Sequence, residues 1–489
     1  MSKFYVTTSI PYVNGLPHIG FAMELIQADV LARYHRQSGD DVWFVTGTDE
    51  HGVKIARAAE EAKTTPQKYI EPFKDAFKQL AEQVNARPDQ FIRTTDAAHQ
   101  KSAQALWKAC AKDIYKSTYE GWYCVGCELF YTEQELPERI CPIHKAPLEL
   151  VKEDNYFFKL SEYTDRVRTA INSGRYEIVP EIRRNEILAL LDRGLEDISI
   201  SRDKSKLSWG VPVPGDPDQV MYVWFDALPN YTSAVGYPDG ENFAKYWPAD
   251  LHIIGKDILR FHAALWPAML MSAGIELPKK LYVHGFISSE GHKMSKSLGN
   301  VVAPGEVIEK YGVDALRYYL LREIPSEGDG DFSWAHMESV YNADLANDLG
   351  NLVQRVAVMV KKYQQGVFGD LPEHSHDIAP YLDAMAGLHF DKALDEVWLL
   401  VRGLNQLLEE EKPWELAPGG KRADAIHLGE VLQHAVTDLM QIATLLLPFM
   451  PNTAEKIAAT FKDGAVHSEV GILFPKSDTI EKTDITFAG

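Results

Sequence analysis

Residues 251–287 read LHIIGKDILRFHAALWPAMLMSAGIELPKKLYVHGFI, and this stretch decides the fold class. Two short apolar runs, LHIIG at 251–255 and LYVHGFI at 281–287, enclose a longer pattern at 256–274 with helical periodicity. A strand, a helix and a second strand in this order are the unit from which parallel sheets are built. The stretch therefore predicts one half of a doubly wound α/β sheet.

The N-terminal part of the chain repeats this alternation. A strand-like run at 3–9 leads through a loop into a helical pattern at 21–36, which stops at Ser38-Gly39. A short apolar strand at 42–47 follows, and then two helical patterns between 52 and 85, with Pro66 placed to start the second. We expect these segments to form the other half of a Rossmann-like parallel sheet.

Two further regions have a different pattern. From about Tyr115 to Lys159 the sequence is rich in aromatic residues and short turns and holds three of the four cysteines, which indicates an inserted module. Past about Ser333 the pattern is almost wholly helical as far as Phe461, which predicts an antiparallel helix bundle.

The composition limits the class of protein. The chain has 489 residues, enough for roughly two to four domains. Its net charge of −20 argues against a nucleic-acid partner, although net charge does not determine the charge at one groove. The sequence has no apolar run of about 18 residues and no signal core, so we expect no membrane span and a cytoplasmic location.

Pro17-His18-Ile19-Gly20 stands between the first strand and the first long helix. A helix N-terminus offers N–H groups to an anion, and Gly20 would let a ligand approach the backbone. His18 adds a hydrogen-bond donor for phosphate oxygens. The alternative is a structural histidine in a loop.

A second motif, GHKMSKSLGN at 291–300, follows the second half of the predicted sheet. Its two lysines and two serines form a cationic strip suited to closing over a polyphosphate, the alternative being an exposed basic loop. Both motifs fall at carboxyl ends of predicted strands, where open α/β sheets bind ligands. The chain has neither GxxxxGK[ST] nor GxGxxG, so neither a P-loop nor a dinucleotide fingerprint accounts for phosphate binding.

The clustered cysteines suggest a metal site. Cys124, Cys127, Cys141 and His144 form a C-x2-C-x13-C-x2-H pattern. Two pairs of such ligands fit a tetrahedral zinc ion, which with four protein ligands would be structural. Incidental thiols are the alternative, and Cys110, on a helical pattern, is expected to be a buried apolar residue.

HIG and KMSKS are the paired signatures of class I aminoacyl-tRNA synthetases. The segments PYVNGLPHIG, GTDEHG, YVWFDAL, IGKDILRFHAALWPAML, VHGF and KMSKSLGN resemble in particular the methionyl-tRNA synthetase family. The resemblance implies ATP-dependent activation of L-methionine to methionyl-adenylate, with release of pyrophosphate, and transfer to tRNA(Met). It also implies Mg with ATP, one structural Zn ion and an anticodon-binding helix bundle, with neither DNA nor a membrane as a partner.

By this resemblance the chain divides into five segments. These are residues 1–114 and 181–285 for the two halves of the Rossmann-like catalytic domain, 115–180 for a connective insertion with a zinc knuckle, 286–332 for the KMSKS loop and stem-contact region, and 333–489 for the α-helical anticodon-binding domain.

The family's functional residues carry over to matching positions. Those that would stabilise the reacting phosphates are His18, Lys293 and Lys296. Those that would bind ATP are His18, Gly20, Gly255, Asp257, Lys293, Ser295 and Lys296. Those that would bind methionine are Ile10, Tyr12, Asp49, Trp224, Ala227, Leu228, Tyr231, Ile258, Phe261 and His262. Those that would bind the anticodon are Asn351, Arg355 and Trp414, and the zinc ligands would be Cys124, Cys127, Cys141 and His144.

The residue types suit these roles. The Asp49 carboxylate would pair with the substrate ammonium, and aromatic rings contact a polarizable thioether favourably. An amide, a guanidinium and an indole match the needs of unstacked bases. The alternatives are core packing for Trp224 and Phe261 and ordinary surface roles for Arg355 and Trp414.

One position departs from the family. Its first signature ordinarily continues HIG with a second histidine, whereas this chain has Phe21, which cannot donate a hydrogen bond. Losing such a donor costs about 100–1000-fold in rate. We expect compensation, since His18, Gly20 and both lysines are kept.

Other readings of the sequence stay open. They are a class I synthetase for another amino acid, a small ligase with the same adenylation chemistry, and a catalytically silent tRNA-binding paralogue. Because the chain ends at Gly489, soon after the predicted bundle, we expect a monomer.

Overall fold

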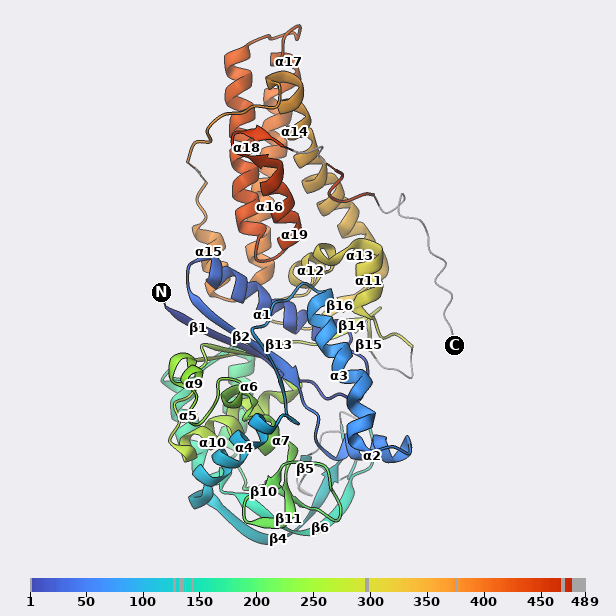
Figure 1. Ribbon diagram of the computed structural model, residues 1–489, viewed down its shortest axis with the longest axis vertical. Coiled ribbons are helices and arrows are strands. Elements are labelled where there is room, and N and C mark those ends of the chain that lie inside the picture. Colours follow the sequence, from blue (N-terminus) through green and yellow to red (C-terminus); the bar gives the residue numbers. More distant parts are fainter. Residues whose placement is uncertain are drawn as a thin grey trace. The chain divides into compact units, whose positions relative to one another are not determined.

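The computed structural model describes residues 2–125, 129–131, 136, 138–142, 145–294, 299–373, 376–467 and 471–476. Contacts within the chain separate two compact units (Figure 1). The sheet unit comprises residues 1–17, 35–82 and 86–284, and the helical unit comprises residues 18–34, 83–85 and 285–489. Most of helix α1 (Ile19–Gln37) therefore groups with the helical unit, although it directly follows the first strand in sequence.

The sheet unit is built on a six-stranded parallel sheet with the order β3-β2-β1-β12-β13-β7. The strands are β1 (Lys3–Thr8), β2 (Asp41–Thr48), β3 (Gln90–Arg93), β7 (Glu177–Val179), β12 (Leu251–Gly255) and β13 (Lys280–His284). The two sequence halves meet where β1 pairs with β12, with Val6 opposite Leu251. This arrangement confirms the expected doubly wound parallel sheet.

Two details of the sheet differ from the sequence expectation. The short edge strand β7 was not anticipated. The run LYVHGFI also forms two strands, β13 and then β14 (Ile287–Ser289), with Gly285 between them. Within the helical unit, a Cβ on Gly285 would lie 2.0 Å from the carbonyl oxygen of Gly328. Only glycine fits so close an approach, which accounts for the break.

Along the sequence, helices alternate with the strands of this unit. They are α2 (Val53–Glu61), α3 (Pro66–Gln83), α4 (Ala97–Ala109), α5 (Thr164–Asn172), α6 (Glu181–Asp192), α7 (Val223–Ala227), α8 (Asn230–Ser233), α9 (Glu241–Tyr246) and α10 (Trp266–Ala273), with 3-10 turns at Ala111–Asp113, Leu160–Tyr163 and Lys256–Ile258. The helix expected at 256–274 is thus a 3-10 turn, a π-helical stretch at Phe261–Leu265, and α10. Pro267 lacks the N–H that a regular helix would donate to residue 263, consistent with the irregular turn before it.

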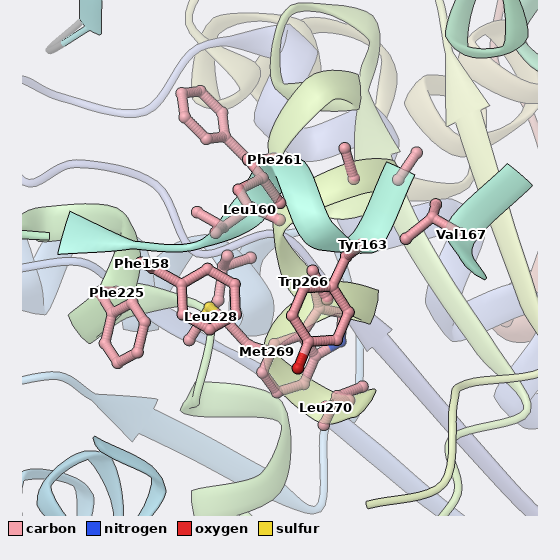
Figure 2. Close-up of a cluster of buried hydrophobic side chains, with 14 of the residues drawn as sticks. Phe158, Leu160, Tyr163, Val167, Phe225, Leu228, Phe261, Trp266, Met269 and Leu270 are labelled. Atoms are coloured by element: carbon pink, nitrogen blue, oxygen red, sulfur yellow. The ribbon is translucent and has the colours of Figure 1, made fainter. Parts of the chain in front are cut away.

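A large apolar core fixes this irregular helix. Figure 2 shows Trp266 and Met269 from the helix close to Phe158 and Leu228 from other parts of the chain, and Phe261 belongs to the same cluster. Trp266 and Met269 are fully buried, and Phe261 is 6% exposed. Because packed interiors tolerate little rearrangement, α7 and the π-helical stretch are held in fixed positions.

Two further sheets lie outside the central one; the inserted module contributes strands to the first, and residues 198–221 supply the other strands. An antiparallel sheet has the order β5-β4-β6-β8, and a smaller one has the order β10-β11-β9. The strands are β4 (Ile114–Cys124), β5 (Leu129–Tyr131), β6 (Glu149–Phe158), β8 (Ile198–Ser199), β9 (Ser201–Asp203), β10 (Pro212–Val213) and β11 (Asp216–Met221).

The helical unit confirms the predicted helical C-terminal part. Its helices after α1 are α11 (Pro304–Tyr311), α12 (Val313–Arg322), α13 (Trp334–Val340), a π-helical stretch (Tyr341–Gly350), α14 (Asn351–Gln364), α15 (Ala379–Ala386), α16 (Phe390–Glu411), α17 (Pro413–Leu416), α18 (Ala425–Leu446) and α19 (Pro451–Thr460). Helices α14, α16 and α18 lie side by side (Figure 1). The strands are β14, β15 (His292–Lys293), β16 (Gly330–Phe332), β17 (Phe461–Lys462) and β18 (Ala465–Val466). Among the described helices, none is long and apolar enough to cross a bilayer.

A buried arginine fastens α1 inside the helical unit. Arg317 of α12 is fully buried, and its Nη2 lies 2.8 Å from Oδ2 of Asp29 on α1. The same guanidinium donates to the carbonyl oxygens of Val84, Pro448 and Phe449. One buried guanidinium thus joins α1 and α12 to the backbone at Val84 and at Pro448–Phe449.

Candidate functional site

The carboxyl ends of the parallel strands carry several of the predicted residues. Asp49 directly follows β2 and pairs with Tyr12, which lies in the loop after β1. The backbone N–H of Asp49 donates to the carbonyl of Pro11 at 2.9 Å, and its Oδ1 accepts from the N–H of His51 at 3.3 Å. Asp49 is only 4% exposed, so its carboxylate is held in one position beside Tyr12.

An aromatic group forms around α7 and the π-helical stretch. The rings of Trp224 and Phe261 stack with centroids 3.8 Å apart and planes 10° apart. The His262 ring meets Trp224 edge-on at 6.0 Å. Such a group offers both faces and edges of rings to an apolar ligand.

Hydrogen bonds determine the tautomer of His262. Its Nδ1 lies 3.0 Å from the carbonyl oxygen of Ile258, which can only accept, so Nδ1 carries the proton. In the neutral ring Nε2 is then an acceptor, and the Tyr231 hydroxyl donates to it at 2.7 Å. Tyr231 and His262 are 1% and 2% exposed. The structure therefore brings five of the predicted residues together: Trp224, Tyr231, Ile258, Phe261 and His262.

The remaining predicted methionine residues have other surroundings. Ala227 ends α7 and Leu228 follows it, and both are buried, with Leu228 in the core cluster of Figure 2. Ile10 packs against a different apolar cluster that contains Tyr5 and Val235.

A buried carboxylate between two histidines links the strand ends to α7, and sequence reasoning missed it. His51 Nδ1 lies 2.7 Å from Oδ2 of Asp226, and His99 Nε2 lies 3.0 Å from Oδ1. All three side chains are at most 3% exposed. His51 stands two residues after Asp49 and Asp226 two residues after Trp224, so this network joins the two parts of the site. The signal in the sequence was an aspartate inside the otherwise apolar run YVWFDAL.

A second ion pair, between a buried carboxylate and a partly exposed guanidinium, supports the same edge of the sheet. Glu50 accepts from Nε and Nη2 of Arg93, at the end of β3, at 2.7 and 2.8 Å. Its backbone N–H donates to the hydroxyl of Thr94 at 2.9 Å. Consecutive residues of GTDEHG thus have separate partners, which fixes the backbone on both sides of Asp49.

The Asp226 network predicts a dependence of stability on pH. Burial opposes ionisation of Asp226, but the charge and hydrogen bonds of His51, and then of His99, outweigh it and lower the pKa to about 2. A pKa lowered from the ordinary 3.8 stabilises the folded chain above that value, and the stabilisation is lost as pH falls through 2. It amounts to about 2–3 kcal/mol at neutral pH, of which about half remains at pH 3.

Urea unfolding of the wild type and Asp226→Asn at pH 7, 5, 4 and 3 measures this effect. We expect the difference in unfolding free energy between the two proteins to be constant from pH 7 to 5 and to narrow below pH 4. A difference that stays unchanged down to pH 3 would contradict the assignment.

Gly255 and Asp257 occupy the end of β12. A Cβ at position 255 would lie 2.9 Å from Oδ1 of Asp257 and 3.6 Å from Cε1 of His284, at the end of the neighbouring β13. The glycine therefore lets the Asp257 side chain fold over the strand end. The carboxylate itself is exposed.

In the helical unit, His18 folds back onto the start of α1. The N–H of Gly20 donates to Nδ1 of His18 at 3.1 Å, which leaves the proton of the neutral ring on Nε2. Burial lowers the pKa of His18 to about 4, so the ring is neutral at pH 7. A Cβ on Gly20 would lie 2.9 Å from Cε1 of His18, so a side chain at this position would displace the ring.

The backbone at this helix start already has acceptors. The N–H of Ile19 donates to the carbonyl of Val302 at 3.1 Å, and that of Phe21 donates to the carbonyl of His18 at 3.0 Å. The Nε2–H of His18 is therefore the donor that this end of α1 can direct to an anion.

Phe21 packs on the histidine. The two rings stack with centroids 4.3 Å apart and planes 30° apart. A phenyl ring here keeps water from one face of the imidazole and so favours its neutral form. The residue that departs from the family signature thus supports His18, although it supplies no donor of its own.

The base of the 291–300 loop is well defined. Lys293 lies in β15, paired with Ser288 of β14, and the amide of Asn300 donates to the carbonyl of Lys293 at 3.2 Å. The N–H of Gly291 donates to Asp331 at 2.9 Å. Both ends of the loop are thus fixed, and Lys293 is exposed. Ser295 and Lys296 lie outside the described residues.

The predicted anticodon residues lie on the bundle. Asn351 and Arg355 are one turn apart at the start of α14, and Arg355 forms an ion pair with Glu409 of α16 at 2.7 Å. Trp414, in the short α17 that follows α16, is 40% exposed. The ion pair brings Arg355 beside the end of α16, next to the segment with the exposed indole.

Two of the predicted zinc ligands are brought together. Cys124 and Cys141 are both buried in a small cluster with Leu148. A tight turn follows Cys141, whose N–H donates to the carbonyl of Ala146 at 2.9 Å and whose carbonyl accepts from Lys145 at 2.8 Å. Cys127 and His144 lie outside the described residues. Cys110 is buried, as predicted, and burial raises the pKa of its thiol to about 12.

Comparisons with known proteins agree with this geometry. A family model described as tRNA synthetases class I (M) matches residues 4–149 and 133–357. A methionine–tRNA ligase from Thermotoga maritima is 44% identical over 473 residues, covering 93% of this chain and 74% of the relative. One from Brucella suis is also 44% identical, over 93% of this chain and 91% of the relative.

A solved structure matches the whole fold. Mycobacterium tuberculosis methionyl-tRNA synthetase in complex with methionyl-adenylate has a TM-score of 0.87 at 39% identity, over 97% of this chain and 98% of that chain. Since the family model spans most of the sequence and the relatives match 93% of it, the chain belongs to the methionine–tRNA ligase family of class I tRNA synthetases.

Proposed function

We propose that this chain activates L-methionine with ATP and transfers it to tRNA(Met). The observation that carries the proposal is the aromatic group around His262 beside the sheet edge that holds Asp49. It stands in a chain that is 39% identical to an enzyme solved with methionyl-adenylate. The intermediate in that structure contains both the amino acid and the nucleotide of the first reaction step.

The amino acid would be recognised within the sheet unit. The Asp49 carboxylate would pair with the substrate ammonium, and the stacked Trp224 and Phe261 rings would contact the methyl thioether. His262, with its tautomer fixed by Ile258 and Tyr231, closes the polar end of the aromatic group. A rigid apolar pocket separates similar side chains only modestly, so the fixed polar atoms add to its selectivity.

In the first step, a carboxylate oxygen of methionine attacks the α-phosphorus of ATP. A P–O bond forms, the bond to the β-phosphate oxygen breaks, and pyrophosphate leaves with Mg bound to it. The protein's part is positioning and charge stabilisation. The Nε2–H of His18 would donate to a phosphate oxygen, with Lys293 and Lys296 of the loop neutralising the leaving group, and Gly20, Gly255, Asp257 and Ser295 contacting the nucleotide.

In the second step, a ribose hydroxyl of the terminal adenosine of tRNA attacks the methionyl carbonyl. A C–O bond to the ribose forms, the C–O bond to AMP breaks, and AMP leaves, its phosphate taking the proton of the hydroxyl. The tRNA would be selected on the bundle, where Asn351 and Arg355 would hydrogen-bond anticodon bases and the exposed Trp414 would stack on one. Arg355 would exchange its exposed ion pair with Glu409 for the RNA at little cost.

The inserted module would hold one structural zinc ion. Buried thiols in a single cluster, one of them opening a tight turn, have the chemistry that zinc requires. Cys124 and Cys141 would be two ligands, with Cys127 and His144 completing the set. The ion would supply folding energy to the module rather than catalysis.

Methionine-dependent exchange of pyrophosphate into ATP tests the proposal. Exchange is expected with methionine and not with leucine, valine, isoleucine or cysteine, and charging of tRNA(Met) should follow. Phe21→His, run in parallel, measures what the second signature histidine would add. Exchange with a different amino acid would overturn the methionine assignment. Its absence in the wild type together with recovery in Phe21→His would favour the silent-paralogue alternative.

Three expectations from the sequence stay predictions. They are the five segment boundaries, a monomeric state and a cytoplasmic location. Analytical ultracentrifugation of the full chain measures the second directly.

A further inference from the structure

A second cluster of histidines with an aspartate lies on the helix bundle, apart from the residues discussed above. His434 and Asp438 are four residues apart on α18, so they share one face of that helix. His376 comes from the segment between α14 and α15. Its Nε2 lies 2.9 Å from Oδ1 of Asp438, and Nε2 of His434 lies 3.4 Å from Oδ2.

The ligand atoms of these three residues converge on one point. One nitrogen or oxygen from each lies within 4.8 Å of the other two, and within the described part of the chain this is the group of metal-binding side chains that does so. Ligand atoms around a tetrahedral zinc ion, bound at about 2.0–2.1 Å, are about 3.4 Å apart. A small inward movement of two exposed rings would therefore suffice for coordination.

The exposure of the three side chains suits a site that exchanges a metal ion with solvent. The Asp438 side chain is 7% exposed, whereas those of His376 and His434 are 35% and 45% exposed. The buried Asp438 carboxylate is held in place by the residues around it, and the two more exposed imidazoles can bind an ion that arrives from solvent. The buried His51–Asp226–His99 network uses the same residue types but lies almost wholly out of solvent.

We propose that His376, His434 and Asp438 bind a divalent transition-metal ion, with zinc preferred. Two imidazoles and a carboxylate are a ligand set typical of zinc, and a fourth position stays available to water. Binding requires both coordinating nitrogens to be unprotonated, so the ion replaces the hydrogen bond that Asp438 now accepts from His376 and its contact with His434.

The ion would fasten one segment of the bundle. The chain between α14 and α15 already contacts its neighbours through Gln433, which donates to the carbonyl of Asp370, and through a bridge between Val367 and Ala465. A metal ion would replace the hydrogen bond from His376 to Asp438 by coordination, at a second point on α18, the helix that also carries Gln433. Because an ion that binds only the folded chain stabilises it by mass action, thermal unfolding should depend on zinc concentration.

Calorimetric titration of the full chain with Zn²⁺ tests the site, after a mild chelator has removed loosely held metal. The variants are His434→Gln and His376→Gln. The control is His336→Gln, which removes an exposed imidazole paired with one carboxylate, Glu323 Oε2, at 2.8 Å. Titration with Co²⁺ distinguishes the site from the cysteines, because thiolate ligands give an intense near-ultraviolet band and imidazoles do not.

Wild type and the His336→Gln control are expected to bind one equivalent of zinc. Both site variants should lose that equivalent or bind it at least about 10–100-fold more weakly. A loss of this size in metal affinity is known for mutating residues that only hydrogen-bond to a metal ligand. Zinc should raise the thermal midpoint of the wild type and not of the site variants. Equal stoichiometry and affinity in all four proteins, or a cobalt spectrum that is entirely thiolate in character, would overturn the proposal.

Discussion

His18→Ala is expected to lower methionine-dependent pyrophosphate exchange by about 100–1000-fold, the cost of removing one preorganised donor from a developing charge. The imidazole is neutral at pH 7 because burial lowers its pKa to about 4, and its Nδ1 accepts from Gly20. Its one remaining donor is thus Nε2–H, which alanine removes. The loss should fall on the maximal rate, since the residues that we propose for methionine recognition lie in the sheet unit.

Two controls separate this effect from misfolding. His336→Ala removes an exposed histidine of the same helical unit and should exchange at the wild-type rate. Methionine binding, measured by calorimetric titration, should be unchanged in His18→Ala. Near wild-type exchange in His18→Ala would show that another group stabilises the phosphates.

Arg317→Met should destabilise the helical unit by about 3–5 kcal/mol, the usual cost of breaking a buried ion pair by removing one partner. Asp29 is fully buried and would lose the charge of Arg317, while its ion pair with Arg33, at 2.7 Å, would remain. The carbonyls of Val84, Pro448 and Phe449 would lose their common donor, and methionine offers none. The measurement is the unfolding free energy from urea titration followed by circular dichroism.

Arg322→Met is the matched control, since it changes the same residue type on the same helix. Arg322 pairs with Asp395 at 2.8 Å, but that carboxylate is 56% exposed. The Arg322 side chain is 14% exposed, but its removal leaves the Asp395 carboxylate in water, so the loss should be about 0–1 kcal/mol and this variant should unfold close to the wild type. Similar losses in both variants would mean that the burial of Arg317 does not govern its contribution.

Sequence patterns predicted the elements that depend on local periodicity. The helix expected at 21–36 is α1 (Ile19–Gln37), and the strand expected at 251–255 is β12. The sequence patterns failed where contacts between distant parts of the chain determine the secondary structure. The run 281–287 breaks at Gly285 because of a distant carbonyl, that of Gly328, and β7 is too short to show any periodicity.

The same division holds for the candidate site. Motifs pointed to Asp49, Trp224 and His262, and the structure gives each a defined environment. The supporting network could not be foreseen, since His51, His99 and Asp226 are separated by 48 and 127 residues or more along the chain and meet only in the folded core. A motif search finds residues that contact a ligand, whereas packing determines the residues that hold them.

The ion pair between Asp29 and Arg317 has a consequence for protein engineering. A cut at residue 332, which the sequence suggests as a domain boundary, would separate Arg317 from Pro448 and Phe449, and Asp314 from the backbone N–H of Thr453 that it accepts at 2.6 Å. Exchanging the bundle for that of a relative would therefore need α1 and α12 to be exchanged with it. A chimera that moved only residues 333–489 would unite two halves of a buried interface that had not evolved together.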